Sequence, residues 1–465
     1  MSLPARRPFR RLALLLATAA SLIVPAALAD GVDDYILGFM QRTHTPGVAL
    51  AVVRDGKVEK MATYGVADAF ARTNLEPSHT FQIASATKML TGVALGRLEQ
   101  AGKLSLDDDL RRHFPDAPDS WSRITIRQLA THSSGLEDRL GLGPDATTAD
   151  IVAAAMKTPL AYEPGSRSRY GFTDFVVLQA LIEKLSGEPF PAALRTWALT
   201  PLGMVESGFS TETNGTWTDR AAGIHVFRDG RQARDDFGYT PAGYAAGGLL
   251  TSLNDLVRFA QAIDKGDALP AATWQRLWMV PPFSIGKPGD FAIGWTKRDL
   301  LGHVAVGHSG GPALADILRL PDDRLTIMVM TNQRWLYPML ADGVAARYMP
   351  DRARMLPDDR PEMAERLRHA LDSAARGTMD KTGFTEEAGN GMQGFFNDFG
   401  SALLTAAGPV RSIRLMEKAT TPDGGDRRRY RVQFQHQSMV WLFSLNAAGQ
   451  VDLMRPASDS TPLLP

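Results

Sequence analysis

The sequence predicts a two-domain protein. Its α/β (α+β) first domain has an antiparallel sheet flanked by helices with a helical insert, and its second domain is small and α+β. Three observations predict this fold. Strand patterns occur near both ends of residues 30–350, helical patterns and Gly/Pro-rich loops lie between them, and a charged, proline-containing stretch then separates a shorter segment. A chain of 465 residues is long enough for two or three domains.

The N-terminus has the composition of an export signal. A basic head precedes an apolar stretch over residues 12–28, and Ala27 and Ala29 place small side chains where a signal peptidase cleaves. We therefore expect residues 1–29 to be a signal peptide and the mature protein to be periplasmic or secreted, without an integral membrane span. An arginine pair in the head also fits the twin-arginine export route. An uncleaved membrane anchor is the alternative interpretation.

The composition excludes several classes of function. Hydrophobic residues make up 44% and charged residues 22% of the chain, as is ordinary for a soluble globular protein. The 51 basic and 51 acidic residues balance, whereas nucleic-acid-binding proteins usually carry a positive excess, so we expect no nucleic acid partner. The chain has no cysteine, and its nine histidines include no pair spaced for a helical zinc site. We therefore expect no thiol chemistry, no metal and no other cofactor.

The expected secondary structure of the first domain, residues 30–350, begins and ends with strands. An apolar run, an Asp55-Gly56 turn and a returning run predict a hairpin. Apolar residues then recur at helical spacing until just before Gly102, which suits a left-handed helix end. The predicted strands cover residues 48–53, 57–66, 304–306 and 325–331, the first helix covers 89–98, and the helical insert covers about 104–260.

The second domain follows a linker predicted over residues 351–361 and covers residues 362–465. Its patterns predict helices over 363–376 and 386–406 and strands over 413–419, 429–434 and 439–445. Trp441 and Phe443 are expected in its core rather than on a binding surface. Packing on the first domain and binding of a partner both remain open for this domain, as does the oligomeric state.

Ser85 and Lys88 are the candidate catalytic residues at the start of the first predicted helix. Residues three apart share one face of a helix, so the amine of Lys88 can approach the hydroxyl of Ser85. A serine hydroxyl needs an adjacent base to act as a nucleophile, and a partly desolvated lysine can lose its proton and serve as that base. The alternative is that Ser85 only caps the helix. Ser284 and Lys287 have the same spacing, but no helix follows them, and we interpret that pair as accidental.

Five signatures, in order along the chain, support the catalytic interpretation. They are Phe81 to Lys88, Leu129 to Leu136, Glu163-Pro164-Gly165 with Tyr170, Ala246 to Leu249 with Ser252 to Phe259, and Gly307 to Gly311. On these residues the chain from Gly47 to Asn332 resembles the β-lactamase-related family of serine hydrolases. This family includes class C β-lactamases, D,D-peptidases and related esterases, and the resemblance implies a β-lactamase/transpeptidase-like fold.

The resemblance also implies roles for individual residues. Ser85 would be the nucleophile, Lys88 its proton partner, and Tyr170 a general acid or base, provided that neighbouring cations lower its pKa. The alternative for Tyr170 is a buried aromatic residue with a satisfied hydroxyl. The backbone N–H groups of Ser85 and Gly311 would form the oxyanion hole that stabilises a tetrahedral intermediate. No metal or organic cofactor is implied.

The substrate-binding residues implied by the resemblance are Phe172, His308, Ser309 and Gly310. Gly310 fits a strand along which substrate backbone approaches closely. Two of the four depart from the family pattern. Phe172 stands where the family usually has asparagine and cannot hydrogen-bond a substrate amide. His308 stands where lactamases and peptidases often have lysine, and a neutral imidazole holds a carboxylate less firmly than a permanent cation.

Both departures favour ester hydrolysis over β-lactam hydrolysis, with a small-molecule or peptide acyl group as substrate. D,D-peptidase, β-lactamase or D-amino-acid amidase activity is one alternative. A catalytically weak penicillin-binding sensor or interaction protein is another. A rival enzyme class comes from residues 307–311, which also match the Gly-x-Ser-x-Gly nucleophile elbow of α/β-hydrolases around Ser309. That fold requires an acid and a histidine downstream, and only His369 and His436 follow, both beyond the predicted linker.

Overall fold

The computed structural model describes most of the chain. The described residues are 31–212, 217–287, 289–311, 314–337, 339–459, 461 and 463. The signal peptide expected over residues 1–29 lies outside them. Within these described ranges, no helix is both long enough and apolar enough to span a bilayer.

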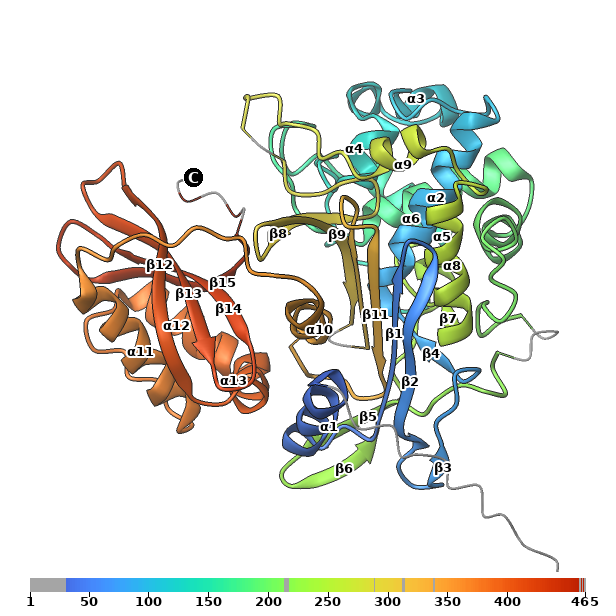
Figure 1. Cartoon of the computed structure of the whole chain (residues 1–465). Helices are drawn as coiled ribbons and strands as arrows, with labels where there is room; N and C mark the ends of the chain where they lie inside the picture. The colour runs from blue at the N-terminus through green and yellow to red at the C-terminus, as the bar shows by residue number, and fades with distance from the viewer. Residues whose placement is uncertain are drawn as a thin grey trace, which may run out of the picture.

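A seven-stranded antiparallel sheet forms the centre of the first domain (Figure 1). In spatial order its strands are β3 (Thr73–Asn74), β2 (Lys57–Asp68), β1 (Gly47–Arg54), β11 (Leu325–Thr331), β10 (Ala315–Leu320), β9 (His303–Gly310) and β8 (Thr296–Leu300). Val48 of β1 pairs with Tyr64 on one side and with Thr331 on the other. The two ends of the domain's sequence therefore form adjacent central strands, as the strand pattern predicted.

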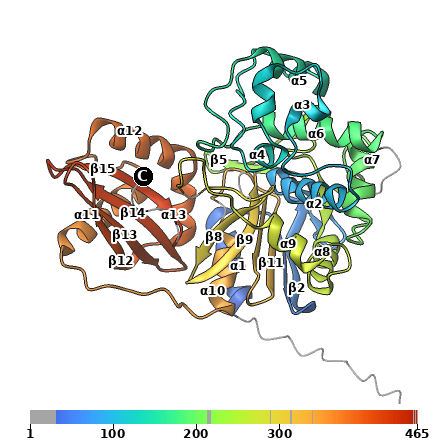
Figure 2. The same ribbon diagram turned by 90° about the horizontal axis from the view of Figure 1, so that it is seen from above.

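One face of this sheet is covered by the helical region (Figure 2). Its helices are α2 (Thr87–Gln100), α3 (Leu110–His113), α4 (Ile126–Ala130), α5 (Thr148–Lys157), α6 (Thr173–Ser186), α7 (Phe190–Leu194), α8 (Leu253–Lys265) and α9 (Ala271–Leu277). Two short ribbons accompany them: β4 (Thr80–Gln82) with β7 (Leu250–Ser252), and β5 (His225–Arg228) with β6 (Arg231–Arg234). The β4–β7 ribbon brings the residues just before Ser85 beside those just after Gly248.

The other face of the sheet is covered by α1 (Gly31–Thr43) and α10 (Leu340–Tyr348). Alternate residues of β1 enter the two cores, so the strand is apolar on both faces and reads as a continuous hydrophobic run. The sequence interpretation missed α1, although Val32, Ile36 and Phe39 are buried at helical spacing along it.

The second domain is a four-stranded antiparallel sheet with helices packed on one face. Its elements are α11 (Pro361–Ala375), α12 (Glu386–Phe395), α13 (Ser401–Ala407), β12 (Val410–Thr420), β13 (Asp426–Phe434), β14 (Ser438–Leu445) and β15 (Val451–Ala457). The sequence predicted three strands, and β15 is the fourth. Trp441 and Phe443 are fully buried, which confirms that they belong to the core.

The second domain packs against the α1 and α10 face of the first. One hydrophobic cluster is continuous through both. The hydroxyl of Tyr35 on α1 lies 3.0 Å from Oε1 of Gln437, between β13 and β14. Residues 351–360 contain no helix or strand, but the Leu356 N–H donates to the carbonyl of Leu415 at 2.8 Å. The connecting segment is therefore anchored to the domain that it precedes.

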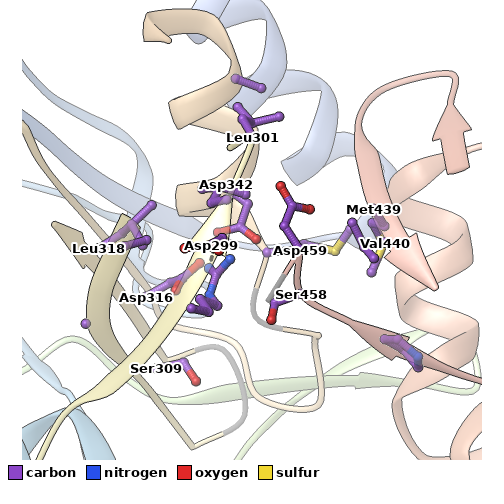
Figure 3. Close-up of a pocket in the computed structure, with 18 of the residues that line it drawn as sticks. Asp299, Leu301, Ser309, Asp316, Leu318, Asp342, Met439, Val440, Ser458 and Asp459 are labelled. Atoms are coloured by element: carbon purple, nitrogen blue, oxygen red, sulfur yellow. Dashed lines mark hydrogen bonds and ion pairs between the residues drawn. The ribbon is translucent and has the colours of Figure 1, made fainter. Parts of the chain in front are cut away.

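A cavity of about 330 Å³ lies where the domains meet, between strands β8–β10, helix α10 and strands β14–β15 (Figure 3). Asp316 lies in its wall, where its carboxylate accepts a hydrogen bond from the Ala341 N–H at 2.9 Å. Arg298 forms an ion pair with the neighbouring Asp342. Burial, and then repulsion from Asp342, raises the pKa of Asp316 to about 6.

We predict that Asp316→Asn stabilises the protein at pH 7–8. The folded-state pKa of Asp316 lies above its unfolded value, so its contribution to stability is lost as pH rises from about 4 through about 6. The neutral amide removes this loss, with a gain of roughly 1–2 kcal/mol above pH 7 and little gain at pH 4.5. Thermal unfolding of both proteins across this range measures the effect. Asp322→Asn, at an exposed position, is the control, and an equal shift at every pH would contradict the prediction.

Candidate active site

Ser85 lies on a strained turn that opens α2. It is the central residue of a 3₁₀ turn, η1 (Ala84–Ala86), whose two other residues are fully buried while Ser85 is partly exposed. Ala84 adopts a φ of 45°, in the left-handed region that non-glycine residues seldom occupy. Its N–H donates to the side-chain oxygen of Gln82 at 2.8 Å. This turn holds the serine hydroxyl at the start of a helix, where backbone N–H groups favour developing negative charge.

Lys88 is buried one turn further along the helix. Only 3% of the residue is exposed, and its ammonium donates to the carbonyl of Ala246 at 2.7 Å. The nitrogen lies 4.9 Å from the ring centroid of Tyr170 and 5.0 Å from that of Phe175. Burial lowers the pKa of Lys88 to about 7, against the opposing charges of two aspartates. A large fraction of Lys88 is therefore a free amine at neutral pH, as a general base must be.

Tyr170 places its hydroxyl in hydrogen-bonding contact with Ser85. The sequence analysis required neighbouring cations to lower its pKa, and that condition is not met. Desolvation instead raises the pKa of Tyr170 to about 12, although 45% of the residue is exposed. The phenol therefore keeps its proton at neutral pH. It is suited to donate a hydrogen bond or a proton rather than to act as the resting base.

The ring of His132 packs against the ring of Tyr170. The two rings lie 4.5 Å apart between centroids, and His132 is 2% exposed. Its Nδ1 lies 3.1 Å from a carboxylate oxygen of Asp174 and 3.3 Å from the nitrogen of Gly171. The sequence analysis treated His132 as a locally bonded loop residue. The structure confirms the local bonds and places the ring of His132 against that of Tyr170.

Asp138 holds the chain segment that follows Tyr170. Its carboxylate accepts hydrogen bonds from the backbone N–H of Phe172 at 3.0 Å and of Thr173 at 2.8 Å. These groups open α6, whose first residues have no side-chain cap of their own. Sequence spacing did not identify Asp138 or Asp174, because each reaches its partners across more than thirty residues.

Two glycines at the end of β9 pack directly on the Ser85 turn. A Cβ on Gly310 would lie 2.0 Å from the carbonyl oxygen of Ile83, and a Cβ on Gly311 would lie 2.8 Å from the Cβ of Ala84. Contacts below 3 Å exclude any side chain at Gly310. The close packing places Gly311 beside Ala84, the residue directly before Ser85. An oxyanion hole formed by the N–H groups of Ser85 and Gly311 would require such an approach of the two segments.

His308 faces the same site from β9. It is 8% exposed, and burial, followed by the charge of Lys88, lowers its pKa to about 3. The imidazole is therefore neutral at physiological pH. Its Nδ1 lies 2.6 Å from the carbonyl oxygen of Ser309, which can only accept, so Nδ1 carries the proton and Nε2 is left as an acceptor. Such a group does not attract a substrate carboxylate.

Ser309 lies on the opposite face of β9, which corrects its assignment to substrate binding. It pairs with Asp316 on β10, and both residues line the interdomain cavity (Figure 3). The next element along the chain is strand β10, antiparallel to β9, rather than a helix. Ser309 is therefore not on a nucleophile elbow. The second Ser-x-x-Lys pair, Ser284 and Lys287, lies exposed in a loop outside any helix.

Tyr239 is a site residue that the sequence analysis missed. Its hydroxyl is also in hydrogen-bonding contact with Ser85, and burial raises its pKa. It lies between β6 and the short 3₁₀ turn η4 (Pro241–Gly243), in no motif that the sequence alone identifies. The sequence analysis identified the Gly247-Gly248 pair as part of a family signature. Nothing in the sequence indicated that the ring of Tyr239 packs against these two glycines.

The fold and the arrangement around Ser85 are those expected of a β-lactamase-related protein, a family whose members are generally serine hydrolases, and comparison with known proteins shows this family. The beta-lactamase family model matches residues 32–345. The chain belongs to this family.

Curated relatives cover the same region. Protein flp from Staphylococcus aureus (strain N315) is 29% identical over 323 residues, which are 65% of this chain and 62% of that protein. Penicillin-binding protein 4* from Bacillus subtilis (strain 168) is 27% identical over 294 residues, 58% of this chain and 64% of that protein. The chain thus matches less than two thirds of the length of these relatives.

Solved structures share the fold. The octameric penicillin-binding protein homologue from Pyrococcus abyssi superposes with a TM-score of 0.61 at 21% identity, covering 89% of this chain and 96% of that one. D-amino acid amidase from Ochrobactrum anthropi SV3, solved with L-phenylalanine amide, gives 0.54 at 24% identity, covering 64% and 91%. The hydrolase EstCE1 gives 0.54 at 21% identity, covering 65% and 94%.

We predict that Gly310→Ala abolishes most catalysis. The added methyl would collide with the Ile83 carbonyl, so β9 would have to move away from Ser85 and take Gly311 with it. A loss of about a hundredfold or more in kcat/KM for p-nitrophenyl butyrate is expected, the scale of a disrupted oxyanion hole. Ser309→Ala, on the same strand but the opposite face, is the matched control, and melting temperatures report on folding. Activity of Gly310→Ala within twofold of wild type would contradict the assignment.

Proposed function

We propose that this protein is an exported serine hydrolase that forms an acyl-enzyme on Ser85 and hydrolyses esters in preference to β-lactams. The observation that carries the proposal is the contact of a protonated phenol, Tyr170, with Ser85, together with a buried lysine, Lys88, one helical turn further on, whose pKa is about 7. The signal-like N-terminus supports export.

The reaction starts with the free amine of Lys88 accepting the proton of Ser85 as Oγ attacks the acyl carbonyl. Negative charge then develops on the carbonyl oxygen beside the N–H groups of Ser85 and Gly311. Tyr170 gives its proton to the departing oxygen and regains one from the Lys88 ammonium. Water attacks the acyl-enzyme by the same route in reverse, so the protons balance over one turnover.

Preference for esters follows from two side chains. His308 is neutral, so it gives no electrostatic anchor to the carboxylate that β-lactams and peptidase substrates carry. Phe172 is 39% exposed at the rim and has no group that can hydrogen-bond an amide. An ester has no amide N–H and requires fewer hydrogen bonds from the site than an amide does. Its alcohol is also a better leaving group than an amine and depends less on proton donation.

Amide hydrolysis is the second candidate. The fold likeness to D-amino acid amidase supports this candidate, and an amine leaving group would require proton donation from Tyr170. A penicillin-binding sensor would acylate once and release slowly. A burst of product without steady turnover distinguishes this third candidate from both enzymes.

We predict that Ser85→Ala abolishes hydrolysis of p-nitrophenyl acetate and butyrate by the mature protein. A fall of about a hundredfold or more is expected for a lost nucleophile. Ser284→Ala tests the second serine–lysine pair, and Ser309→Ala tests the elbow alternative; both should retain activity. If Ser85→Ala stays active while either control loses activity, the proposed nucleophile is wrong.

We predict that kcat/KM for these esters rises with pH through about 7. The rise reports the free enzyme's Lys88, which is a base only after losing its proton, and a buried lysine loses it more readily than an exposed one. Activity should therefore fall about tenfold for each pH unit below 6. Initial rates between pH 5 and 9 measure the profile, corrected for spontaneous hydrolysis. A flat profile across this range would exclude Lys88 as the base.

A further inference from the structure

Two phenol hydroxyls, not one, contact the nucleophile. Tyr239 and Tyr170 are each close enough to Ser85 for a side-chain hydrogen bond, and each phenol keeps its proton because burial raises its pKa. A serine oxygen has two lone pairs and can accept from both. The proposed mechanism uses only Tyr170, so the hydroxyl of the half-buried Tyr239 is a donor without an assigned task.

The fold makes specific room for the Tyr239 ring. A Cβ on Gly247 would lie 2.1 Å from Cζ of Tyr239, and a Cβ on Gly248 would lie 3.2 Å from its Cβ. The same segment supplies the Ala246 carbonyl that receives the Lys88 ammonium. The segment from Ala246 to Gly248, which accepts the hydrogen bond from Lys88, therefore also packs against the ring of Tyr239.

The chain segment that carries Tyr239 is fixed at a second point. Arg334 pairs with Asp235 at 2.8 Å and lies 3.9 Å from the ring centroid of Phe237. The rings of Phe237 and Tyr239 meet edge to face at 5.4 Å. Phe237 in turn lies 3.6 Å from where a Cβ on Gly311 would be. Phe237 therefore links the position of Tyr239 to that of Gly311, which is expected to contribute to the oxyanion hole.

Tyr239 also adjoins Phe172, the residue that lacks the family's amide group. Both rings pack on Gly243: a Cβ there would lie 2.9 Å from Cε2 of Phe172 and 3.2 Å from Cδ1 of Tyr239. A hydrogen-bond donor absent at position 172 is therefore present on an adjacent side chain, at the same rim of the site.

We propose that Tyr239 determines specificity, by donating its hydrogen bond to an acceptor oxygen on the substrate's acyl group in place of the donor missing at Phe172. The favoured substrates are then esters of acids that carry a carbonyl close to the scissile bond, such as N-acylamino acids. The inference rests on the proposed function of Ser85.

The physical reason lies in what acylation does to Ser85. Its Oγ becomes an ester oxygen, which is a weaker acceptor than the hydroxyl it replaces, so the Tyr239 donor loses its resting partner. Tyr239 is half-buried, so a bound acyl group that covers its hydroxyl without supplying an acceptor leaves the donor unsatisfied, which is costly, whereas an amide carbonyl removes this cost. A site built around such a donor discriminates against analogues that lack the acceptor.

The test compares two p-nitrophenyl esters of matched shape, the N-acetylglycinate and the 4-methylpentanoate, which differ in the amide group. The readout is the ratio of their kcat/KM values, in which any loss common to both esters cancels. We expect Tyr239→Phe to lower this ratio about tenfold, mainly through a higher KM for the N-acetylglycinate, as for one lost hydrogen bond. Tyr170→Phe, the matched control, should slow both esters and leave the ratio unchanged.

The double variant Tyr239→Phe with Phe172→Asn should restore part of the ratio, because it returns a donor to the position the family uses. Melting temperatures of each variant report on folding. An unchanged ratio in Tyr239→Phe would mean that this residue only positions Ser85, and would overturn the inference alone. Failure of the wild type to release p-nitrophenol from either ester would overturn the proposed function and this inference with it.

Discussion

The contact between the end of β9 and the Ser85 turn is the constraint on which the site depends. Gly310 has no room for a side chain against the Ile83 carbonyl, and Ala84 tolerates a left-handed backbone directly before the nucleophile. The close approach at Gly310 and the left-handed backbone at Ala84 together fix the relative position of Ser85 and Gly311, which come from opposite ends of the domain. The antiparallel sheet makes the contact possible, because it places β9 beside strands formed by the N-terminal half of the domain.

Desolvation then sets the charge state of four groups around Ser85. The same low-polarity surroundings lower the pKa values of Lys88 and His308 and raise those of Tyr170 and Tyr239. All four are pushed towards the neutral form, as burial dictates. These four groups supply a base, two donors and an acceptor, and none of the four carries a permanent charge. This is the physical basis of the proposed preference for neutral acyl substrates over carboxylates.

The second domain acts on the opposite side of the sheet. It completes the core around α1 and α10, and with β8–β10 it encloses the cavity in which Asp316 loses much of its preference for the charged form. Ser309 lines that cavity, although its neighbours in sequence contact the Ser85 side of the sheet: the ring of His308 meets that of Tyr170, and Gly310 packs on Ile83. A strand alternates its side chains between two faces, so one signature contributes to two separate environments.

The sequence by itself determined the parts of this protein that depend on local spacing: Ser85 and Lys88 one helical turn apart, the hairpin at Asp55-Gly56, the family signatures and the buried Trp441. Only the tertiary structure decided that Tyr239 reaches Ser85, that His132 and Asp138 hold the segment around Tyr170, that Ser309 faces the other domain, and that Tyr170 keeps its proton. The physical reason is the same in each case. Burial and contacts between distant segments set pKa values and side-chain neighbours, and neither is encoded in the spacing of residues along the chain.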